Sequence, residues 1–384
     1  MKVTLVVDRF DAAAGGLEQW TVGFAGFLAA RGHAVHAVAF GAGAHALPVA
    51  VHVLPDPGGI LGRARLVARC VAGLAADAVL DTGTGWSGDV FMPCTGSRRA
   101  SQARLVATHP PLLRWRAALS PRSRLLAWQM AWLERRQVRR ARHVVAVSGA
   151  VRDLLAAQHG IGAERVSVIP NGVDTARFAG ARLAALRPGA RAALGAGTAT
   201  LFLGSAHNMH LKGMDTAIRA LARLHAAGAD VRLAIAGGTP DPFWTGLAGQ
   251  LGVGGRVAFL GWVADTTPLF AAADAFVHPT RWDACSLSTI EAGAAGLPAI
   301  TTTRNGAAAL IEDGATGFVL ADPEDVPALA DRMGRLLDPA FRARLGAAAR
   351  AASAGHDLAR NHAAVEAVLL RFSRAARMPA AAGP

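Results

Sequence analysis

Tyrosine is missing from this 384-residue chain, and lysine occurs only as Lys2 and Lys212 among forty Lys and Arg residues. Its three cysteines, Cys70, Cys94 and Cys285, are widely spaced and odd in number, which argues against a disulfide framework or a zinc site and fits a reducing compartment. No apolar run reaches the roughly 18 residues of a membrane-spanning helix. The N-terminal MKVTLVVDRF lacks the basic segment and cleavage site of a signal peptide. We therefore expect a cytoplasmic protein.

The net charge of +13 favours anionic partners. No zinc-finger, homeodomain or RNA-binding signature accompanies it, so we expect a phosphorylated glycolipid or an anionic membrane surface rather than nucleic acid. The segment 120–143 alternates apolar residues with many arginines at roughly helical spacing. Two interpretations remain open: a helix that lies on the inner face of the cytoplasmic membrane, and a buried helix with a solvated arginine face.

Short apolar runs alternate with longer helical patterns along the whole chain. Strands are predicted in two series, at 3–7, 33–39, 78–81, 144–147 and 166–169, and then at 200–204, 231–236, 257–260, 275–278 and 299–302. Such alternation predicts parallel sheets wound on both faces, and two series predict two α/β domains. The segment 174–197, rich in Ala, Arg and Gly, is interpreted as the hinge. Ligands of such sheets bind beyond the carboxyl ends of the strands, so we expect the site in a cleft between the domains.

In each series, a loop that could bind an anion follows the first strand; the first loop is marked by glycines and the second by a lysine. Gly15-Gly16-Leu17-Glu18 precedes a predicted helix, where glycine lets a ligand approach the backbone and helix amides favour an anion. A GxGxxG fingerprint is missing, so a nicotinamide-dependent enzyme is weakly supported. In the second series, Gly204 ends the strand and the loop 205–213 carries His210 and Lys212 before a helix over 214–227. A lysine there suits a diphosphate, although a solvated surface lysine is the alternative.

The most specific segment follows the predicted strand 275–278. Asp283 and Glu291 are eight residues apart, with a helix expected to begin near Ser286. In that arrangement Asp283 can reach sugar hydroxyls, Glu291 can accept hydrogen bonds from a ribose, and the amides of Ser286 and Leu287 would point at a diphosphate. The alternatives are a helix cap for Asp283 and a solvated helix residue for Glu291.

Taken in order, these segments resemble glycosyltransferase family 4 of the GT-B fold, and within it the branch related to lipopolysaccharide core glucosyltransferases. The resemblance covers nearly the whole chain. It is carried by 144–148 through 169–174, by 201–213, by the Glu-x7-Glu-like element Asp283–Glu291, and by 302–317.

The resemblance implies two Rossmann-like domains facing a cleft and a metal-independent transfer that retains anomeric configuration, which agrees with the missing Asp-x-Asp motif. It implies that Glu291 holds the donor ribose, that Asp283 touches the transferred sugar, that Lys212 stabilises the diphosphate and that Gly16 lies near both substrates. We therefore predict catalytic roles for Lys212, Asp283 and Asp89, and no metal ligand or cofactor. The predicted donor-binding set is Gly16, Gly204, His210, Lys212, Ser286, Leu287 and Glu291.

The chain departs from the family pattern in several places. Asp283 is one methylene shorter than the usual glutamate, and His207 and His210 stand where relatives place an arginine beside the lysine. Cys94 replaces the histidine of a Pro-His-Gly-Gly segment. Asp89 is our candidate acceptor-side group, and His109 is as consistent with a loop residue as with a functional one.

We expect an acceptor-binding domain over 1–175, a donor-binding domain over 176–355, and a C-terminal helix and tail over 356–384 that cross back to the first domain. The expected reaction moves a hexose, glucose from UDP-glucose, to a saccharide or glycolipid acceptor such as lipopolysaccharide core. The alternatives are a mannosyl or galactosyl transferase for another glycolipid or exopolysaccharide, and a non-catalytic nucleotide-sugar-binding protein.

Overall fold

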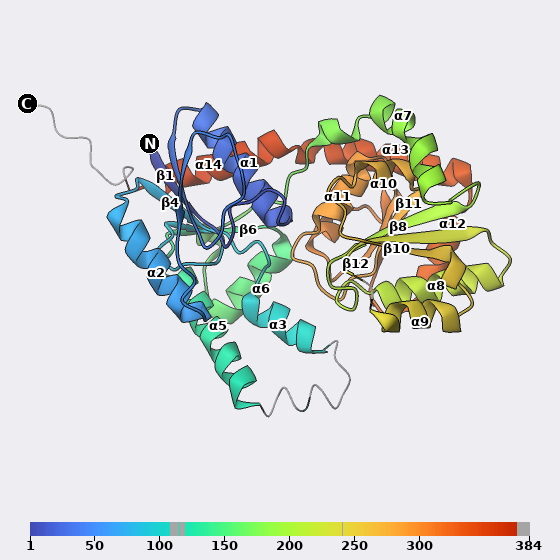
Figure 1. Cartoon of the computed structure of the whole chain (residues 1–384), viewed down its shortest axis with the longest axis horizontal. Helices are drawn as coiled ribbons and strands as arrows, with labels where there is room; N and C mark the ends of the chain where they lie inside the picture. The colour runs from blue at the N-terminus through green and yellow to red at the C-terminus, as the bar shows by residue number, and fades with distance from the viewer. Residues whose placement is uncertain (108–114, 116–119, 240, 375–384) are drawn as a thin grey trace, which may run out of the picture. The chain divides into compact units, whose positions relative to one another are not determined.

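Contacts in the computed structural model divide the chain into two units, each built on one parallel sheet (Figure 1). Unit 1 comprises Met1–Pro170 and the C-terminal segment from Ala359 onward, and unit 2 comprises Asn171–Leu358. The structure describes residues 1–107, 115, 120–239 and 241–374. The candidate His109 therefore lies outside the described residues.

Unit 1 has a seven-stranded sheet of order β3-β2-β1-β4-β5-β6-β7. Its strands are β1 Lys2–Val6, β2 Ala34–Ala39, β3 Val49–Val53, β4 Ala78–Asp81, β5 Val90–Phe91, β6 His143–Ala146 and β7 Val166–Val168. Its helices are α1 Gly16–Ala30, α2 Ile60–Gly73, α3 Arg98–Ala107, α5 Pro121–Arg140, α6 Gly149–His159 and α14 Leu358–Arg371. The central strands β4 and β6 are wholly buried, and β1 is buried except at Lys2, because helices cover both faces of the sheet.

Unit 2 has a six-stranded sheet of order β10-β9-β8-β11-β12-β13. Its strands are β8 Thr200–Ala206, β9 Val231–Gly237, β10 Val257–Gly261, β11 Ala275–His278, β12 Ala299–Thr302 and β13 Gly317–Leu320. Its helices are α7 Gly180–Ala193, α8 Met214–Ala226, α9 Pro242–Gln250, α10 Thr267–Ala272, α11 Leu287–Ala294, α12 Val326–Arg335 and α13 Pro339–Ser353. Short 3-10 helices occupy Ala163–Arg165 in unit 1 and Thr175–Phe178, Gly254–Arg256, Gly306–Leu310 and Ala354–His356 in unit 2.

The two doubly wound parallel sheets predicted from the sequence are confirmed. The prediction of a hinge over 174–197 was wrong, because most of this segment forms the 3-10 helix Thr175–Phe178 and α7 inside unit 2. Arg187 and Arg191 of α7 both bind Asp274, at 2.5 and 2.9 Å, and so fasten this helix to the sheet. The linker was predicted from composition, but alanine and arginine also favour helix, so composition could not distinguish a linker from a helix.

In both sheets the strand order reverses beside the first strand of the unit, between β1 and β4 and between β8 and β11. Ligands of open α/β sheets bind beyond the carboxyl ends of the strands at this reversal point. The loops after β8 and β11 in unit 2, and after β1 and β4 in unit 1, are therefore the places where the fold itself puts a site.

Candidate active site

Two loops meet at the reversal point of the unit 2 sheet, residues 207–213 after β8 and 279–286 after β11. Gly213 closes the first loop with a left-handed φ of 68°, and a Cβ at this position would stand 2.0 Å from the carbonyl oxygen of Pro279. Only glycine permits both that backbone conformation and that approach. Thr280 Oγ1 donates to the carbonyl of Leu211 at 3.1 Å, so the two loops are joined by a hydrogen bond as well as by packing.

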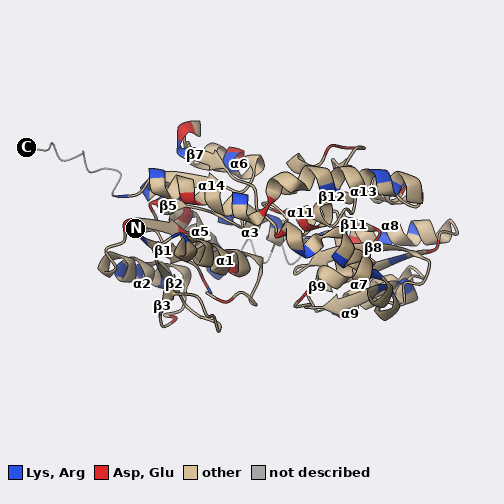
Figure 2. Cartoon of the chain, turned by 90° about the horizontal axis from the view of Figure 1, so that it is seen from above, with Lys and Arg blue, Asp and Glu red and all other residues tan. Residues whose placement is uncertain are grey.

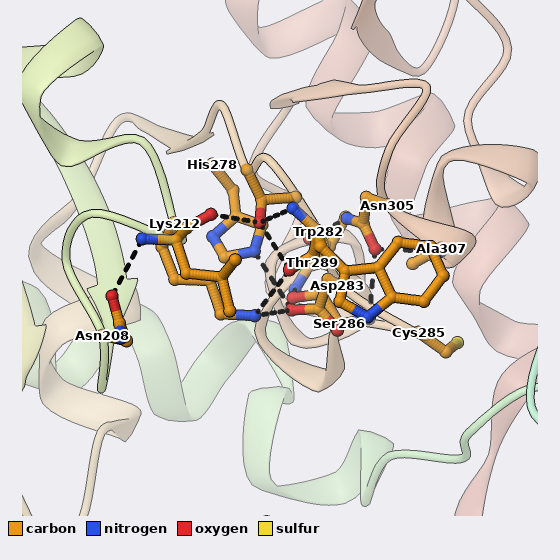
Figure 3. A network of polar contacts seen from close by, with 12 residues as sticks. Asn208, Lys212, His278, Trp282, Asp283, Cys285, Ser286, Thr289, Asn305 and Ala307 are labelled. Atoms are coloured by element: carbon orange, nitrogen blue, oxygen red, sulfur yellow. Dashed lines mark hydrogen bonds and ion pairs between the residues drawn. The ribbon is translucent and has the colours of Figure 1, made fainter. Parts of the chain in front are cut away.

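Lys212, Asp283 and His278 form the charged centre of these loops. Lys212 Nζ lies 2.5 Å from Asp283 Oδ2 and 3.3 Å from the carbonyl oxygen of Trp282. His278 Nε2 lies 3.3 Å from the same carboxylate oxygen, and Figure 3 shows the lysine and the imidazole approaching Asp283 from different directions. The Asp283 backbone is fixed because its N–H donates to Arg304 O at 3.0 Å and its carbonyl accepts from Gly306 N at 2.9 Å.

This environment keeps Asp283 ionised. Burial alone would raise the pKa of the Asp283 carboxyl, but Lys212 and His278 together lower it well below its usual range. Burial lowers the pKa of His278, and the charge of Lys212 lowers it further. The imidazole is therefore neutral near pH 7 and can donate one hydrogen bond, whereas Lys212 supplies the positive charge.

Helix α11 begins at this centre, with Ser286 as its N-cap. The Ser286 hydroxyl accepts from Thr289 N at 3.2 Å, which confirms the helix start predicted near Ser286. The Ser286 N–H, however, donates to Asn305 Oδ1 at 3.2 Å, so the expectation that this amide points at a diphosphate is corrected. Among the described residues nothing accepts from the N–H groups of Leu287 and Ser288, which leaves two amides at the positive end of the helix.

Glu291 lies on α11, and its carboxylate is largely buried. Burial raises the pKa of Glu291, an effect that Arg177 opposes from 3.7 Å. Arg177 is held in turn by Asp265 Oδ1 at 3.4 Å and Thr267 Oγ1 at 3.3 Å. Arg177 was not among the residues predicted from the sequence. The signal that could have found it is its position three residues after the family-like segment that ends at Asp174.

Two other members of the predicted donor set have contacts within the protein. The His210 ring packs on Phe243 and Trp244 of α9, with ring centroids 5.1 and 4.5 Å away. Gly204 lies inside β8, where a Cβ would stand 2.9 Å from Met214 Sδ, so its small size serves the packing of α8. The structure thus brings Lys212, Asp283 and the start of α11 together, whereas Gly204 lies within β8 and packs against Met214.

Arg281 was also missed by sequence reasoning. Its guanidinium binds both carboxylate oxygens of Asp215, at 2.8 and 2.9 Å, and the carbonyl of His210 at 2.6 Å. An arginine is therefore present beside the lysine loop, although it comes from the loop after β11. Its bidentate pair with Asp215 fixes it as a support of the lysine loop.

In unit 1, Gly16 is the first residue of α1, and its N-cap Gly15 has no side-chain cap. Cys94 lies in the loop after β5, where burial and then the charge of Glu18 raise the pKa of its thiol to about 12. The thiol donates to Met92 O at 3.4 Å. Cys94 is thus an uncharged residue near the first turn of α1, and its thiol is not a reactive nucleophile.

Asp89 stands at the amino end of β5, away from the carboxyl ends of the strands. Its carboxylate accepts from Val79 N at 3.1 Å and pairs with Arg374 Nε at 3.2 Å and with Arg142 Nε at 3.6 Å. These are the contacts of a residue that joins β4, β6 and the end of α14. The acceptor-side role of Asp89 stays a prediction, and these contacts do not support it.

Asp81 is a carboxylate at the carboxyl edge of the unit 1 sheet that sequence reasoning used only as a strand end. It accepts from the N–H groups of Gly83 and Gly85 at 2.8 and 3.1 Å, and burial raises its pKa. Arg98 Nη2 donates to the carbonyl of Gly83 beside it. The strand end followed by Gly83 and Gly85 was the signal that could have identified this group.

No group of three or more His, Cys, Asp or Glu side chains suited to a metal ion occurs in the part of the chain that the structure describes. In the same part, no helix is long and apolar enough to cross a membrane.

The architecture and the unit 2 site define a class of protein, and comparison with known proteins agrees. The model "Glycosyltransferase Family 4" matches residues 14–177, and "Glycosyl transferases group 1" matches residues 197–339. A solved structure of WaaG, a glycosyltransferase involved in lipopolysaccharide biosynthesis, superposes with a TM-score of 0.81 at 23% identity and covers 96% of this chain and 99% of its own. The fold is therefore GT-B, and the chain belongs to glycosyltransferase family 4.

Curated relatives differ in what they transfer. A GDP-mannose-dependent phosphatidylinositol monomannoside mannosyltransferase of Mycolicibacterium smegmatis is 34% identical over 269 residues, 66% of each chain. The lipopolysaccharide glucosyltransferase WaaG of Escherichia coli is 37% identical over 113 residues, 29% of this chain and 30% of its own. The alignments span 66%, 50% and 45% of the length of three curated relatives, so this chain matches two-thirds or less of each. A structure of Anabaena Alr3699/HepE with UDP-glucose superposes with a TM-score of 0.71 at 21% identity, covering 96% of this chain and 99% of its own.

Proposed function

We propose that this protein is a retaining, metal-independent glycosyltransferase that moves a hexose from a nucleotide sugar to a saccharide or glycolipid. The observation that carries the proposal is the arrangement around Asp283: Lys212 at 2.5 Å, the N-terminus of α11 at the next residues, and Glu291 farther along the same helix. A cation, helix amides and a carboxylate for hydroxyl groups are the three partners that a nucleotide sugar needs.

In this proposal Lys212 and the amides of Leu287 and Ser288 meet the diphosphate. They stabilise the negative charge that develops as the bond from the sugar to the diphosphate breaks, so the chemistry is positioning and electrostatic stabilisation. Glu291 accepts hydrogen bonds from the ribose hydroxyls, and Asp283 accepts from hydroxyls of the transferred sugar. No protein nucleophile is needed.

The donor we favour is UDP-glucose, because the match to the Escherichia coli glucosyltransferase and the Anabaena structure with UDP-glucose both concern glucosyl or uridine chemistry. The acceptor we favour is the inner core of a lipopolysaccharide. The second candidate is a mannosyl transfer, favoured by the longer alignment with the GDP-mannose-dependent enzyme. We assign donor binding to residues 176–355 and acceptor binding to 1–175, with 356–384 completing the first domain.

A thermal-shift panel in EDTA with UDP, GDP, ADP, CMP, NAD and UDP-glucose tests the donor class. A ligand at about 100 times its Kd adds roughly 2.7 kcal/mol to the free energy of unfolding. We expect stabilisation by UDP and UDP-glucose, and GDP alone would favour the mannosyl alternative. A response to NAD alone would overturn the proposal.

Binding without transfer is the remaining alternative, a non-catalytic nucleotide-sugar-binding protein. Release of UDP from UDP-glucose in the presence of a glycolipid acceptor distinguishes the two. The matched control is Arg219→Gln, an exposed arginine on α8, which should leave UDP release unchanged, whereas Lys212→Ala should abolish most of it. Equal rates in both variants would show that the assigned site does not catalyse the reaction.

We propose further that the first half of α5 rests on an anionic membrane surface. Leu125 and Trp128 are 54% and 57% exposed there, beside the exposed Arg122 and Arg124, whereas Leu133 and Val138 in the second half are buried. Exposed aromatic and apolar side chains among arginines are typical of interfacial helices. Co-sedimentation with anionic vesicles should exceed that with neutral vesicles and fall in Leu125→Ser/Trp128→Ser. Equal and negligible co-sedimentation with both would remove this proposal.

A further inference from the structure

A hollow of about 410 Å³ opens in unit 1 where β6 and β7 begin. Among the residues that the structure describes, eight line it, of which five are arginines and none is acidic. Two of them, Arg142 and Arg165, immediately precede the two strands, and the others come from the last turn of α5 and the end of α14. Segments far apart in the sequence therefore bring like charges to one place, which costs free energy unless something anionic compensates for it.

The protein fixes two of these arginines through backbone carbonyls. Arg142 Nη1 donates to Ser373 O at 2.8 Å and to Phe372 O at 3.3 Å. Arg165 Nη2 donates to Ala141 O at 2.6 Å and to Val138 O at 2.9 Å. Hydrogen bonds to carbonyls orient a guanidinium without cancelling its charge, so the two groups are positioned and remain cationic.

Little negative charge faces the hollow. Asp89 lies 3.6 Å from Arg142 and is shared with Arg374. Among the described residues no carboxylate pairs with the arginines at 139, 140, 165 and 371. The ten residues after Arg374 contain no Asp or Glu.

The pKa of His143 is affected by the same excess of positive charge. It stacks on Phe372 with ring centroids 4.2 Å apart, next to the hollow. Burial lowers the pKa of this histidine, and the charges of Arg371 and Arg165 lower it further. Complementing the negative ends of α5 and α14 accounts for Arg139, Arg140 and Arg371, but not for Arg165, which ends a short 3-10 helix.

We propose that this arginine hollow, defined by Arg139, Arg140, Arg142, Arg165 and Arg371, binds a phosphate-bearing anion. Planar guanidinium groups match phosphate oxygens bidentately, and the volume accepts more than one phosphate group. The site lies at the amino ends of the strands, whereas Gly16 and Asp81 lie at the carboxyl ends, so it is separate from the substrate edge of unit 1. A soluble polyphosphate and a lipid phosphomonoester headgroup share this chemistry.

The test uses the full chain with Lys212→Ala, which removes the cation proposed to meet the donor diphosphate. In this background Arg140→Gln/Arg371→Gln is compared with Arg219→Gln/Arg223→Gln, an equal loss of charge on exposed positions of α8. Arg140 and Arg371 are chosen because they make no ion pair with any described residue. Binding of tripolyphosphate is measured by titration calorimetry. Binding to vesicles of phosphatidylcholine with about one-fifth phosphatidic acid is measured separately, by co-sedimentation.

We expect the affinity for tripolyphosphate to fall about tenfold or more in the Arg140/Arg371 variant and to change less than about twofold in the α8 control. A parallel loss of vesicle binding identifies a lipid headgroup as a ligand, and vesicle binding equal to the control identifies a soluble anion. Equal affinity in all three proteins, an equal loss in both variants, or no binding of tripolyphosphate at all would overturn the proposal.

Discussion

The two Rossmann-like units differ in the residues that lie at the carboxyl ends of their strands. In unit 2 the loops after β8 and β11 bring an ionised pair, Lys212 and Asp283, to the start of a helix. In unit 1 the corresponding edge holds Gly16, the neutral thiol of Cys94 and the buried carboxyl of Asp81, whose pKa is raised. One topology thus places a lysine–carboxylate pair at a helix start in unit 2, whereas the unit 1 edge, which also carries Glu18 and Arg98, holds a neutral thiol and a buried carboxyl. This difference favours the unit 2 edge as the place proposed for a diphosphate.

The largest expected effect comes from removing the unit 2 cation. Lys212→Ala should lower kcat/KM for transfer by about 10²- to 10³-fold, because a positioned donor to developing charge contributes that much. The change also leaves Asp283 without its nearest partner, so circular dichroism should first show that the variant is folded. A loss below about threefold would remove the contrast between the units.

Glu291→Gln sharpens the same contrast on the nucleotide side. The substitution keeps the size of the side chain and would weaken the hydrogen bonds proposed between Glu291 and a ribose, so affinity for UDP should fall about tenfold. Asp265→Asn, an exposed member of the same Arg177 cluster, is the control and should leave UDP affinity within about twofold. Titration calorimetry measures both.

Asp283→Asn should lower the free energy of unfolding by about 1–3 kcal/mol near pH 7, because it removes a partly buried carboxylate from Lys212. The pKa of Asp283 is lower in the folded state than its ordinary 3.8, so the ionised group stabilises the fold above that value. This stabilisation is lost as the pH falls through the folded-state pKa. Urea unfolding should therefore show a wild-type advantage that is constant at neutral pH and shrinks below about pH 4. An advantage that grew toward acid pH would contradict the ion pair.

A smaller effect on catalysis, despite a clear effect on stability, is expected for Asp89. Asp89→Asn weakens its pairs with Arg142 and Arg374, so the melting temperature should fall by about 2–4 °C per kcal/mol lost. The kcat and KM values should stay within about twofold if the residue only holds β4, β6 and α14 together. A selective fall in kcat at unchanged stability would instead restore the acceptor-side role predicted from the sequence.

The smallest effect is expected at Cys94. With its pKa raised to about 12, the thiol should react with a disulfide reagent at pH 8 at least about 100-fold more slowly in the folded protein than after unfolding. Cys94→Ala should leave transfer within about twofold. Rapid labelling of Cys94 in the native protein would show that this thiol is not buried and neutral as its contacts indicate.

The sequence predicted the unit 2 site better than the unit 1 site for a physical reason. Lys212, Asp283 and Ser286 lie in loops that directly follow two neighbouring strands, so sequence spacing and sheet topology suffice to bring them together. The contacts of His210 depend on Phe243 and Trp244 in another helix, and those of Asp89 depend on Arg374, 285 residues away. Such long-range partners leave no trace in local spacing.

The hydrogen-bond partners of backbone amides could not be predicted from the sequence either. Ser286 was correctly predicted as a helix start, yet its N–H is taken by Asn305, nineteen positions along the chain. The helix start follows from a local pattern of a serine before an apolar run, whereas the occupancy of the amide depends on how the loop after β12 folds back. The hinge expected over 174–197 failed similarly, because the pairs of Arg187 and Arg191 with Asp274 decide its structure.

Hydrogen exchange with and without UDP-glucose, in EDTA, tests the central claim most directly, namely that unit 2 holds the nucleotide sugar at the carboxyl ends of β8 and β11. We predict that the ligand slows exchange in peptides covering 207–214 and 283–294, and that this protection disappears in Lys212→Ala. Protection that persisted in Lys212→Ala, or that spared both segments, would contradict the account.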